Sequence, residues 1–423
     1  MIRKKKKQLM TVLVVLIVGV GLFIFLRDGK EKRVITQEQI SPVEMLTMEE
    51  KLEDFEHLYS LIEKEYPLLE VNKRKNGIDW LKEKENFKGL IENTTTDEMF
   101  MEELKTIVGK LNDEHTYIVI ESFFKNIYGI YNQPEYQGKR EPWEKVLNDE
   151  RVLERYRFDE SQLKLLMDSS QHNLPSSNVS YFKSDIIIPD EVAYLKIRGM
   201  NPDVLESDGK LIREFLKEVS NYKKLIIDGR SMNSFAIDTN DYWIKNIVEP
   251  LLNEDLELET YALLRGEYGR EFQEYKGLEF SPIKDLPSSI KEKVANEILE
   301  EFDYFHTMNT TMKSVDPVGF DGEIYVLIDE RVYQRNEDFA AFCKNSGFAT
   351  LVGKTTSGIN HHFEDIFYSL PNSGILLSMR NLISLNNDGT IREEAYVVPD
   401  IEIDGVIGTT YDRDNAIQYV IEK

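Results

Sequence analysis

The sequence predicts an α/β fold with α+β elements: a mostly parallel central sheet, preceded by a helical unit and a single transmembrane helix. From residue 186 onward, short apolar segments alternate with helical segments, a pattern typical of strand–helix–strand units. Residues 47–111 carry apolar side chains at helical spacing, and residues 9–26 form an uninterrupted stretch without charge. The predicted parts are a basic tail (1–8), a signal anchor (9–26), a linker (27–46), a helical unit (47–130), a connecting segment (131–185) and an α/β core (186–423).

The composition indicates a globular body with an acidic surface. Of the 423 residues, 41% are hydrophobic and 30% are charged, which disfavours disorder. The formal net charge is -24; residues 1–33 hold nine Lys/Arg and two Asp/Glu, so the remainder carries -31. This balance disfavours nucleic acid and anionic membrane surfaces as partners of the body. The single cysteine, Cys343, excludes an internal disulfide, and we interpret it as a small core residue on a predicted helix.

The uncharged stretch at residues 9–26 has the length of a membrane span. At ~1.5 Å per residue, its 18 residues extend about 27 Å, close to the ~30 Å hydrocarbon core of a bilayer. No small-residue cleavage pattern precedes Arg27, so we interpret the segment as a signal anchor rather than a cleaved signal peptide. Arg3 and the four lysines that follow it favour a single-pass protein in the cell membrane, with a cytoplasmic N-terminus and an extracytoplasmic body.

Capping residues and apolar spacing predict the helical unit. A helix begins after Thr47 and ends before Pro67, a second lies near residues 79–91, and a third follows Thr95 or Thr96. The third helix runs into the segment LNDEHTYIVI, which places His115 at a junction between a helix and a β-like segment. Helical patches are also predicted near residues 143–156 and 161–167.

The α/β core is predicted from apolar runs and punctuating residues. Strands are expected at residues 192–197, 225–228, 258–264, 324–328 and 350–353, and helices at 205–219, 241–252 and 336–344. Gly347 stands where a helix C-cap is common. Residues 287–306 are predicted to be mostly helical, and the sequence is β-rich from residue 350 through Val398.

Several stretches of the chain resemble one enzyme family when they are taken in order. The first stretch is LNDEHT, and the second is LIIDGR, followed by a loop and then DYWIKNIVEPLL. The third is YVLIDERVY with EDFAAFCKNSGFATLVG after it. The fourth is LPNSG, and the fifth is NDG, followed by EE and VVPDI. Over about residues 111–401 the chain resembles the tail-specific, or C-terminal-processing, serine peptidases, whose relatives include the core of tricorn protease. The resemblance implies hydrolysis of peptide bonds without a cofactor, by a serine nucleophile, a base and N–H donors for the oxyanion.

The nucleophile and the oxyanion loop of this family do not match the chain. Family members carry a serine in a pattern like VY-S-x-x-E-x-F-A, and the resemblance places Gln334 at that serine position. An amide has no ionisable nucleophilic atom. The family also has a glycine-rich loop after the strand that ends in IID, and here no glycine follows Arg230. The loop positions are Ser231, Met232, Asn233 and Ser234.

The chain retains the base that one of the two branches of the family uses, but not the base of the other branch. The tricorn-like branch uses the histidine of D-x-H-T, which corresponds to His115, assisted by a glutamate that corresponds to Glu393 or its neighbour Glu394. The other branch uses a lysine, and that position is Ile359 here. We interpret Glu337, by contrast, as a charge favoured by a helix N-terminus.

We therefore expect a peptidase-family protein that binds a peptide or protein and is catalytically impaired. Loss of the nucleophile in a serine protease costs on the order of a million-fold in kcat. One alternative is an active hydrolase with His115 as base and a relocated nucleophile among Ser231, Ser234 and Ser357. Another is a structural or assembly protein in which the helical unit is the working surface.

No metal site is expected from the sequence. His361, His362 and Glu364 form a short cluster without further spaced ligands, and this pattern alone is weak evidence for a metal.

Overall fold

The computed structural model describes residues 45–132, 138, 140–158, 181–200, 202–230, 240–333, 336–358, 363–405, 408 and 410–423. Residues 46–423 form one compact unit. The predicted span at residues 9–26 and the predicted helical patch at 161–167 lie outside the described residues. Within the described part of the chain, no helix has the length and apolar character needed to cross a membrane.

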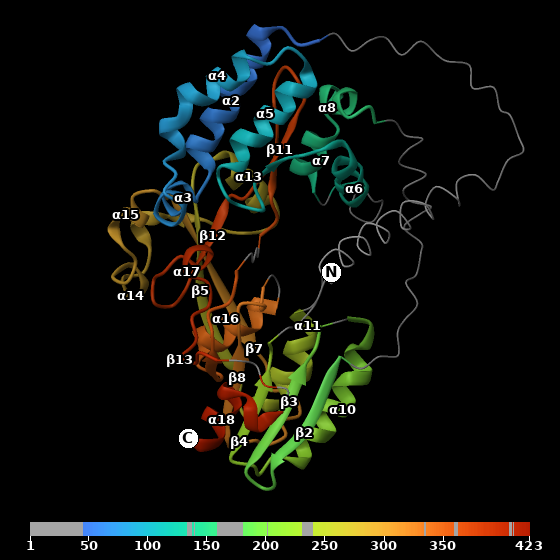
Figure 1. Cartoon of the computed structure of the whole chain (residues 1–423), viewed down its shortest axis with the longest axis vertical. Helices are drawn as coiled ribbons and strands as arrows, with labels where there is room; N and C mark the ends of the chain where they lie inside the picture. The colour runs from blue at the N-terminus through green and yellow to red at the C-terminus, as the bar shows by residue number, and fades with distance from the viewer. Residues whose placement is uncertain are drawn as a thin grey trace, which may run out of the picture. The chain divides into compact units, whose positions relative to one another are not determined.

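The helical unit is built from α2, α3, α4 and α5, and blue helices α2, α4 and α5 lie side by side in Figure 1. Thr47 begins α2 with a capping box, because its hydroxyl accepts the Glu50 N–H while the Glu50 carboxylate accepts the Thr47 N–H. Thr96 caps α5 in a similar way, through the N–H of Met99. The bounds are α2 Met48–Glu65, α3 Leu69–Asn76, a 3₁₀ turn at Trp80–Glu83, α4 Lys84–Glu92 and α5 Asp97–Gly109.

The next segment contains one short strand and three helices. The β-like run predicted after His115 forms only two paired residues, and a helix that we did not predict follows it. The elements are β1 Tyr117–Ile118, α6 Glu121–Tyr131, α7 Glu141–Leu147 and α8 Glu150–Arg155.

The predicted central sheet has six strands in the order β13-β9-β8-β4-β3-β2. All neighbouring pairs are parallel except β2 with β3, so the expectation of a mostly parallel sheet holds for this sheet. The strands are β2 Phe182–Ile188, β3 Val192–Ile197, β4 Lys224–Asp228, β8 Glu323–Ile328, β9 Thr350–Gly353 and β13 Ile401–Glu402.

Alternating side chains of these strands enter two different cores. One face packs against helices α10, α16 and the helical segment of residues 240–251, and the other packs against α18. Gly347 ends α16 in a left-handed conformation with φ of 70°, as its position predicted. The bounds are α10 Leu205–Glu218, α11 Asn240–Trp243, a π-helical turn Ile244–Val248, α12 Glu249–Leu251, α16 Asn336–Ser346 and α18 Asn415–Glu422.

Two antiparallel sheets accompany the parallel one, so the molecule has a mixed α/β architecture. The four-stranded sheet has the order β12-β5-β7-β6, and the three-stranded sheet has the order β1-β11-β10. The strands are β5 Leu256–Leu264, β6 Ser281–Pro282, β7 Tyr304–Met312, β10 Ile366–Ser369, β11 Leu376–Met379 and β12 Leu382–Leu385. The remaining helices are α13 Tyr268–Tyr275, α14 Ser288–Lys291, α15 Asn296–Leu299 and α17 Arg392–Ala395, with 3₁₀ turns at Pro202–Val204, Ile283–Asp285 and Tyr411–Arg413.

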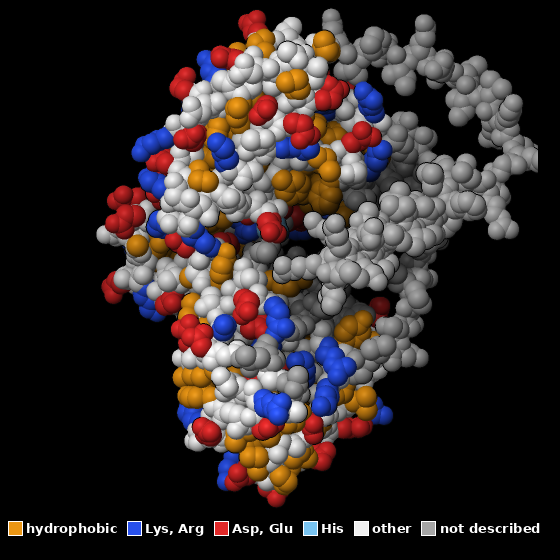
Figure 2. Space-filling model, viewed as in Figure 1, with side chains coloured by type: hydrophobic (Ala, Val, Ile, Leu, Met, Phe, Trp, Pro, Cys, Tyr) orange, Lys and Arg blue, Asp and Glu red, His pale blue; other side chains and the backbone are white. Residues whose placement is uncertain are grey.

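The prediction of a mostly helical segment at residues 287–306 is wrong. Its helical part is limited to the four-residue helices α14 and α15, and residues 304–306 begin the nine-residue strand β7. The charged side chains that suggested a surface helix belong to these short turns. On the visible face, acidic and basic side chains are interspersed rather than segregated (Figure 2).

Candidate active site

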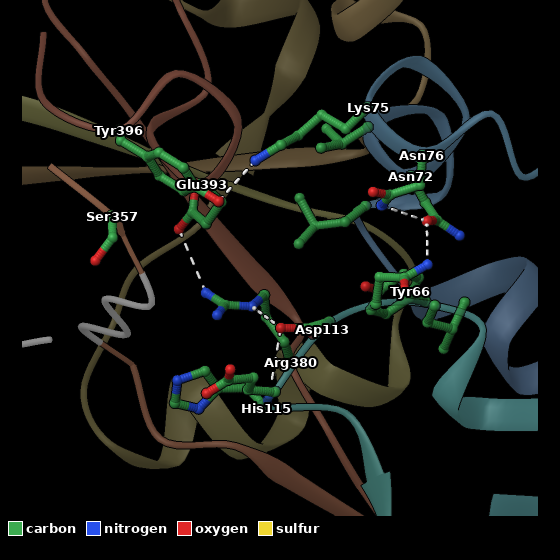
Figure 3. Close-up of a pocket in the computed structure, with 15 residues that line it drawn as sticks. Tyr66, Asn72, Lys75, Asn76, Asp113, His115, Ser357, Arg380, Glu393 and Tyr396 are labelled. Carbon is green, nitrogen blue, oxygen red and sulfur yellow. Dashed lines mark hydrogen bonds and ion pairs between the residues drawn. The ribbon is translucent and has the colours of Figure 1, made fainter. Parts of the chain in front are cut away.

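His115 lies in the turn between α5 and β1, where it lines a cavity of about 300 Å³ (Figure 3). The Asp113 carboxylate holds this turn, because it accepts the backbone N–H of His115 at 3.3 Å and the hydroxyl of Thr116 at 2.7 Å. The His115 side chain is 26% exposed. The sequence therefore places this histidine at a fixed, solvent-accessible position in the cavity wall.

Asp365 lies beside the imidazole of His115, and the sequence analysis did not identify it. Its Oδ2 atom is 3.4 Å from Nδ1 of His115. A carboxylate that accepts a hydrogen bond from Nδ1–H orients the ring and leaves Nε2 free to act as the base. The Asp365 backbone is fixed in turn by the indole N–H of Trp143, which donates to its carbonyl at 2.8 Å.

Glu393 lines the same cavity, but its ion pair leads to Arg380 rather than to the histidine ring. Its carboxylate accepts the N–H of Ser384 at 3.1 Å and lies 3.5 Å from the Arg380 guanidinium. Burial raises the pKa of Glu393, and the charge of Arg380 partly opposes this rise. Arg380 also contacts Asp113 at 3.3 Å, so a chain of polar contacts connects Glu393 to the turn of His115 (Figure 3).

The neighbouring glutamate, Glu394, takes no part in these polar contacts and instead binds Arg74 of α3. Its carboxylate accepts two hydrogen bonds from Arg74, at 2.6 and 2.8 Å. A two-point contact between an arginine and a carboxylate fixes orientation as well as distance. Of the two candidate glutamates, Glu393 therefore lines the His115 cavity and Glu394 fastens the helix that forms another part of its wall.

Glu337 is buried rather than placed as a solvated charge at the start of α16. Its carboxylate accepts a hydrogen bond from the hydroxyl of Thr356 and lies 3.7 Å from the guanidinium of Arg392. Burial raises the pKa of Glu337, and Arg392 acts in the opposite direction. The interpretation as a simple helix-dipole charge thus omits its main contacts, which join α16 to α17 and to the segment after β9.

Ser357 lines the cavity together with His115, and it follows directly on Thr356. Its backbone N–H donates to the carbonyl of Val332 at 3.1 Å. The next residue, Gly358, forms a parallel bridge with Tyr333, which immediately precedes the nucleophile position in the sequence. The segment that carries Ser357 therefore runs beside Val332 and Tyr333.

Asp228 at the end of β4 is the centre of a buried polar network. Arg230 binds its two carboxylate oxygens at 2.9 and 3.0 Å, and Tyr194 donates to Oδ2 at 2.6 Å. Arg230 also reaches Asp414 at 3.0 Å. Burial alone would raise the pKa of Asp228, but Arg230 and Lys196 outweigh it and hold the pKa below its usual value. The arginine that precedes the expected oxyanion loop is therefore folded into the core.

Several predicted site positions lie outside the described residues. They are Gln334, Ser231, Met232, Asn233, Ser234, Ile359, His361 and His362. Within the described ranges, no group of three or more His, Cys, Asp or Glu side chains is arranged to hold a metal ion. Cys343 is buried in α16, and burial raises the pKa of its thiol well above the usual value, as fits a core residue.

The arrangement supplies an oriented base, a cavity and a set of buried charges. No local pattern in the sequence singles out Asp365 or Arg380, because their contacts with His115 and Asp113 span 250 and 267 positions of the chain. Asp365 precedes β10 and Arg380 follows β11, and these paired strands bring both residues to the turn of His115.

Comparisons with known proteins agree with the family resemblance. Residues 266–403 match the model of peptidase family S41. A candidate peptidase from Parabacteroides merdae has 14% sequence identity and a TM-score of 0.51, with 88% of this chain and 96% of that chain covered. The photosystem II D1 C-terminal processing protease has 11% identity and a TM-score of 0.43, covering 88% of this chain and 97% of that chain. No curated protein matches the chain.

The resemblance to the tail-specific peptidase family is thereby confirmed: the chain contains a peptidase family S41 region, and its fold is an α/β peptidase fold. The matched residues run from the loop before α13 to β13 and include Asp365, Arg380 and Glu393. His115 precedes the matched residues in the sequence, and the fold brings it to the same cavity as Arg380 and Glu393.

Proposed function

We propose that this protein is a membrane-anchored, extracytoplasmic member of the tail-specific peptidase family that binds polypeptide and does not hydrolyse it. The observation that carries the proposal is the glutamine at position 334, where family members have their serine. The cavity with His115 and Asp365 supports a retained binding site. Without an attacking oxygen, the oriented histidine has no acyl transfer to assist.

Fluorophosphonate labelling of the detergent-solubilised full-length chain tests the loss of serine chemistry. These reagents form an adduct with an activated serine, and intact mass detects one adduct per chain. We expect no adduct in the wild type and none in His115→Ala. An adduct in the wild type that is absent in His115→Ala would contradict the proposal, because it requires an active serine that depends on the histidine.

The second candidate function is an active hydrolase with Ser357 as a relocated nucleophile. The observation in its favour is that Ser357 and His115 line the same cavity. In this case the adduct would map to Ser357 and disappear in Ser357→Ala. Thr355→Ala, a nearby hydroxyl that does not line the cavity, is the matched control and should keep the adduct.

A structural or assembly role of the helical unit is the third candidate. Leu58, Leu104 and other residues of this unit share one hydrophobic core with Leu263 and Leu377 of the sheets. Deletion of residues 47–111 would therefore expose this core and destroy the fold. Charge reversals of exposed residues on α4 and α5 test the role more cleanly, and retained partner capture in such variants would count against it.

The membrane anchor is proposed on the length and flanking charge of residues 9–26. Because the only native cysteine is buried, an engineered surface cysteine reports topology without background. Glu292→Cys places a thiol at an exposed site of the body. We expect a membrane-impermeant maleimide to label it in intact cells, and labelling only after lysis would contradict an extracytoplasmic body.

A further inference from the structure

Tyr396 is shared by two cavities of the molecule. It lines the cavity of about 300 Å³ that contains His115, and it also lines a second cavity of about 530 Å³. Both volumes lie within the range typical of ligand pockets, ~300–1,000 Å³. The second cavity is bounded by Lys344 and Asn345 near the end of α16, by Lys293, and by the loop of residues 386–390, together with residues 395–398.

The backbone of Tyr396 is held in a conformation that ordinary residues avoid. Its φ of 58° and ψ of -154° lie in a region populated essentially by glycine. Such strain persists only where neighbouring contacts enforce it, and it gathers at binding sites and switches. Here the strained residue is one that lines both cavities.

Two contacts hold the ring in place. Lys75 of α3 donates a hydrogen bond to the Tyr396 hydroxyl at 2.7 Å (Figure 3). On the other side the ring lies against Gly358, where an added Cβ would approach the ring carbon Cε1 to 2.1 Å. Gly358 is bridged to Tyr333, so the ring covers the segment that pairs with Tyr333.

The second cavity has the lining expected for a peptide backbone. Among the described residues, Nδ2 of Asn345 and Oδ1 of Asn386 and Asn387 have no hydrogen-bond partner. Side-chain amides offer a donor and an acceptor, as peptide groups do. Val398 adds an apolar contact, because it is 49% exposed within the same wall.

We propose that the two cavities are halves of one groove for an extended polypeptide segment, and that Tyr396 is the gate that divides it. This inference rests on the proposed function and deepens it, because it assigns the second cavity as a binding subsite. When the ring swings away from Gly358 and Lys75, a chain can continue from the amide-lined cavity past Gly358 to His115. If the gate is closed in most molecules, the apparent affinity equals the affinity of the open form multiplied by the fraction of molecules that are open.

The test measures binding of a synthetic pool of fluorescein-labelled, unstructured dodecapeptides to the detergent-solubilised full-length chain. Tyr396→Gly removes the ring and suits the backbone conformation, so it should fold. We expect its Kd to fall about tenfold or more relative to the wild type. Tyr396→Phe keeps the ring but loses the hydrogen bond from Lys75, so it should tighten binding less than Tyr396→Gly does. Lys82→Met, at an exposed position that lines neither cavity, is the matched control, with an expected change of less than about threefold. Lys75→Met removes one hold on the ring and should also tighten binding.

A photocrosslinker at position 398 reports occupancy of the second cavity. With p-benzoylphenylalanine in place of Val398, we expect a peptide adduct whose yield rises in the Tyr396→Gly background. Peptide binding with equal Kd in the wild type and Tyr396→Gly, without an adduct at position 398, would overturn the gate and leave the proposed binding function intact. Absence of peptide binding to every variant would overturn both.

Discussion

At the scale of single residues, the buried guanidinium of Arg380 connects two parts of the site. It is buried between two carboxylates, those of Asp113 and Glu393. Burial alone would lower its pKa, but the two negative charges outweigh this effect and raise it. The guanidinium therefore stays charged and joins the turn of His115 to α17.

We predict that Arg380→Met lowers the free energy of unfolding by about 3–5 kcal/mol, because it leaves two buried carboxylates without their cation. Urea unfolding of the full-length chain measures the change. Lys223→Met is the control, since Lys223 and its partner Glu191 are 70% and 49% exposed and such pairs contribute about 1 kcal/mol or less. Equal losses in the two variants would contradict a special role for Arg380.

Glu301 gives a prediction for pH dependence. Burial, together with the nearby charge of Glu70, raises its pKa to about 7. A raised pKa in the folded state contributes stability that is complete below the unfolded value, near 4.5, and is lost as the pH rises through about 7. Ionised Glu301 therefore destabilises the protein under mildly alkaline conditions.

We expect Glu301→Gln to raise the unfolding midpoint at pH 8 by roughly 1–2 °C, a small effect because the side chain remains partly solvated. At pH 4 the difference should vanish. Glu292→Gln removes the same charge at an exposed position and serves as the control. Thermal unfolding followed by circular dichroism at both pH values measures the midpoints. A midpoint gain that is larger at pH 4 than at pH 8 would contradict the predicted direction of the pH dependence.

At the scale of elements, carboxylates of α2 fasten loops of the sheet region. Glu65 accepts the backbone N–H groups of Glu267, Tyr268 and Gly269 at the start of α13. The loop can approach so closely because Gly266 lacks a Cβ, which would lie 2.3 Å from the Glu65 carboxyl carbon. Asp54 accepts the N–H groups of Asn372 and Ser373 in the same manner.

We predict that Glu65→Ala costs about 2–3 kcal/mol of stability, because it leaves three N–H groups without their charged acceptor. Glu63→Ala removes an exposed glutamate from the same helix and should change stability by less than about 0.5 kcal/mol. The comparison is made by urea unfolding. If both variants unfold at the same midpoint, the contacts of Glu65 contribute no more than a surface charge does.

The elements that the sequence predicted well are those with strong local signals. Thr47 and Thr96 mark the starts of α2 and α5, and the apolar runs of β4, β8 and β9 are found within one or two residues of the expected bounds. The missed elements lack such signals. Helix α3 buries only a few side chains, and α6 begins in a run that reads as alternating.

The site was predictable only in part, for a related reason. His115 stands out through its motif, but its partner Asp365 directly precedes β10, and no local pattern connects that position to His115. Strand β1 pairs with β11 through Tyr117 and Ser378, residues far apart in the chain. Contacts of this kind depend on the tertiary fold, which composition and periodicity do not specify.

At the scale of the whole molecule, two large cores are joined by two long strands. One core unites the helical unit with the antiparallel sheets, and the other underlies the six-stranded sheet. Strand β7 contributes Phe305 to the first core and Met312 to the second. Strand β5 contributes Leu263 to the first and packs Leu258 against the second. The nine-residue pairing of β5 with β7 therefore connects them mechanically.

This connection predicts that residues 46–423 unfold as one cooperative unit. If one core unfolded alone, β5 and β7 would each keep one buried end and expose the other. Such partial unfolding is unfavourable, because it exposes apolar surface without the full gain in chain entropy. Hydrogen exchange in increasing urea measures this directly. We expect peptides from α2 and from β8 to lose protection at the same urea concentration, with circular dichroism showing a single transition. Loss of protection in α2 while β8 stays protected would mean that the helical core opens separately, and the cavity of His115 would then form only when that core docks.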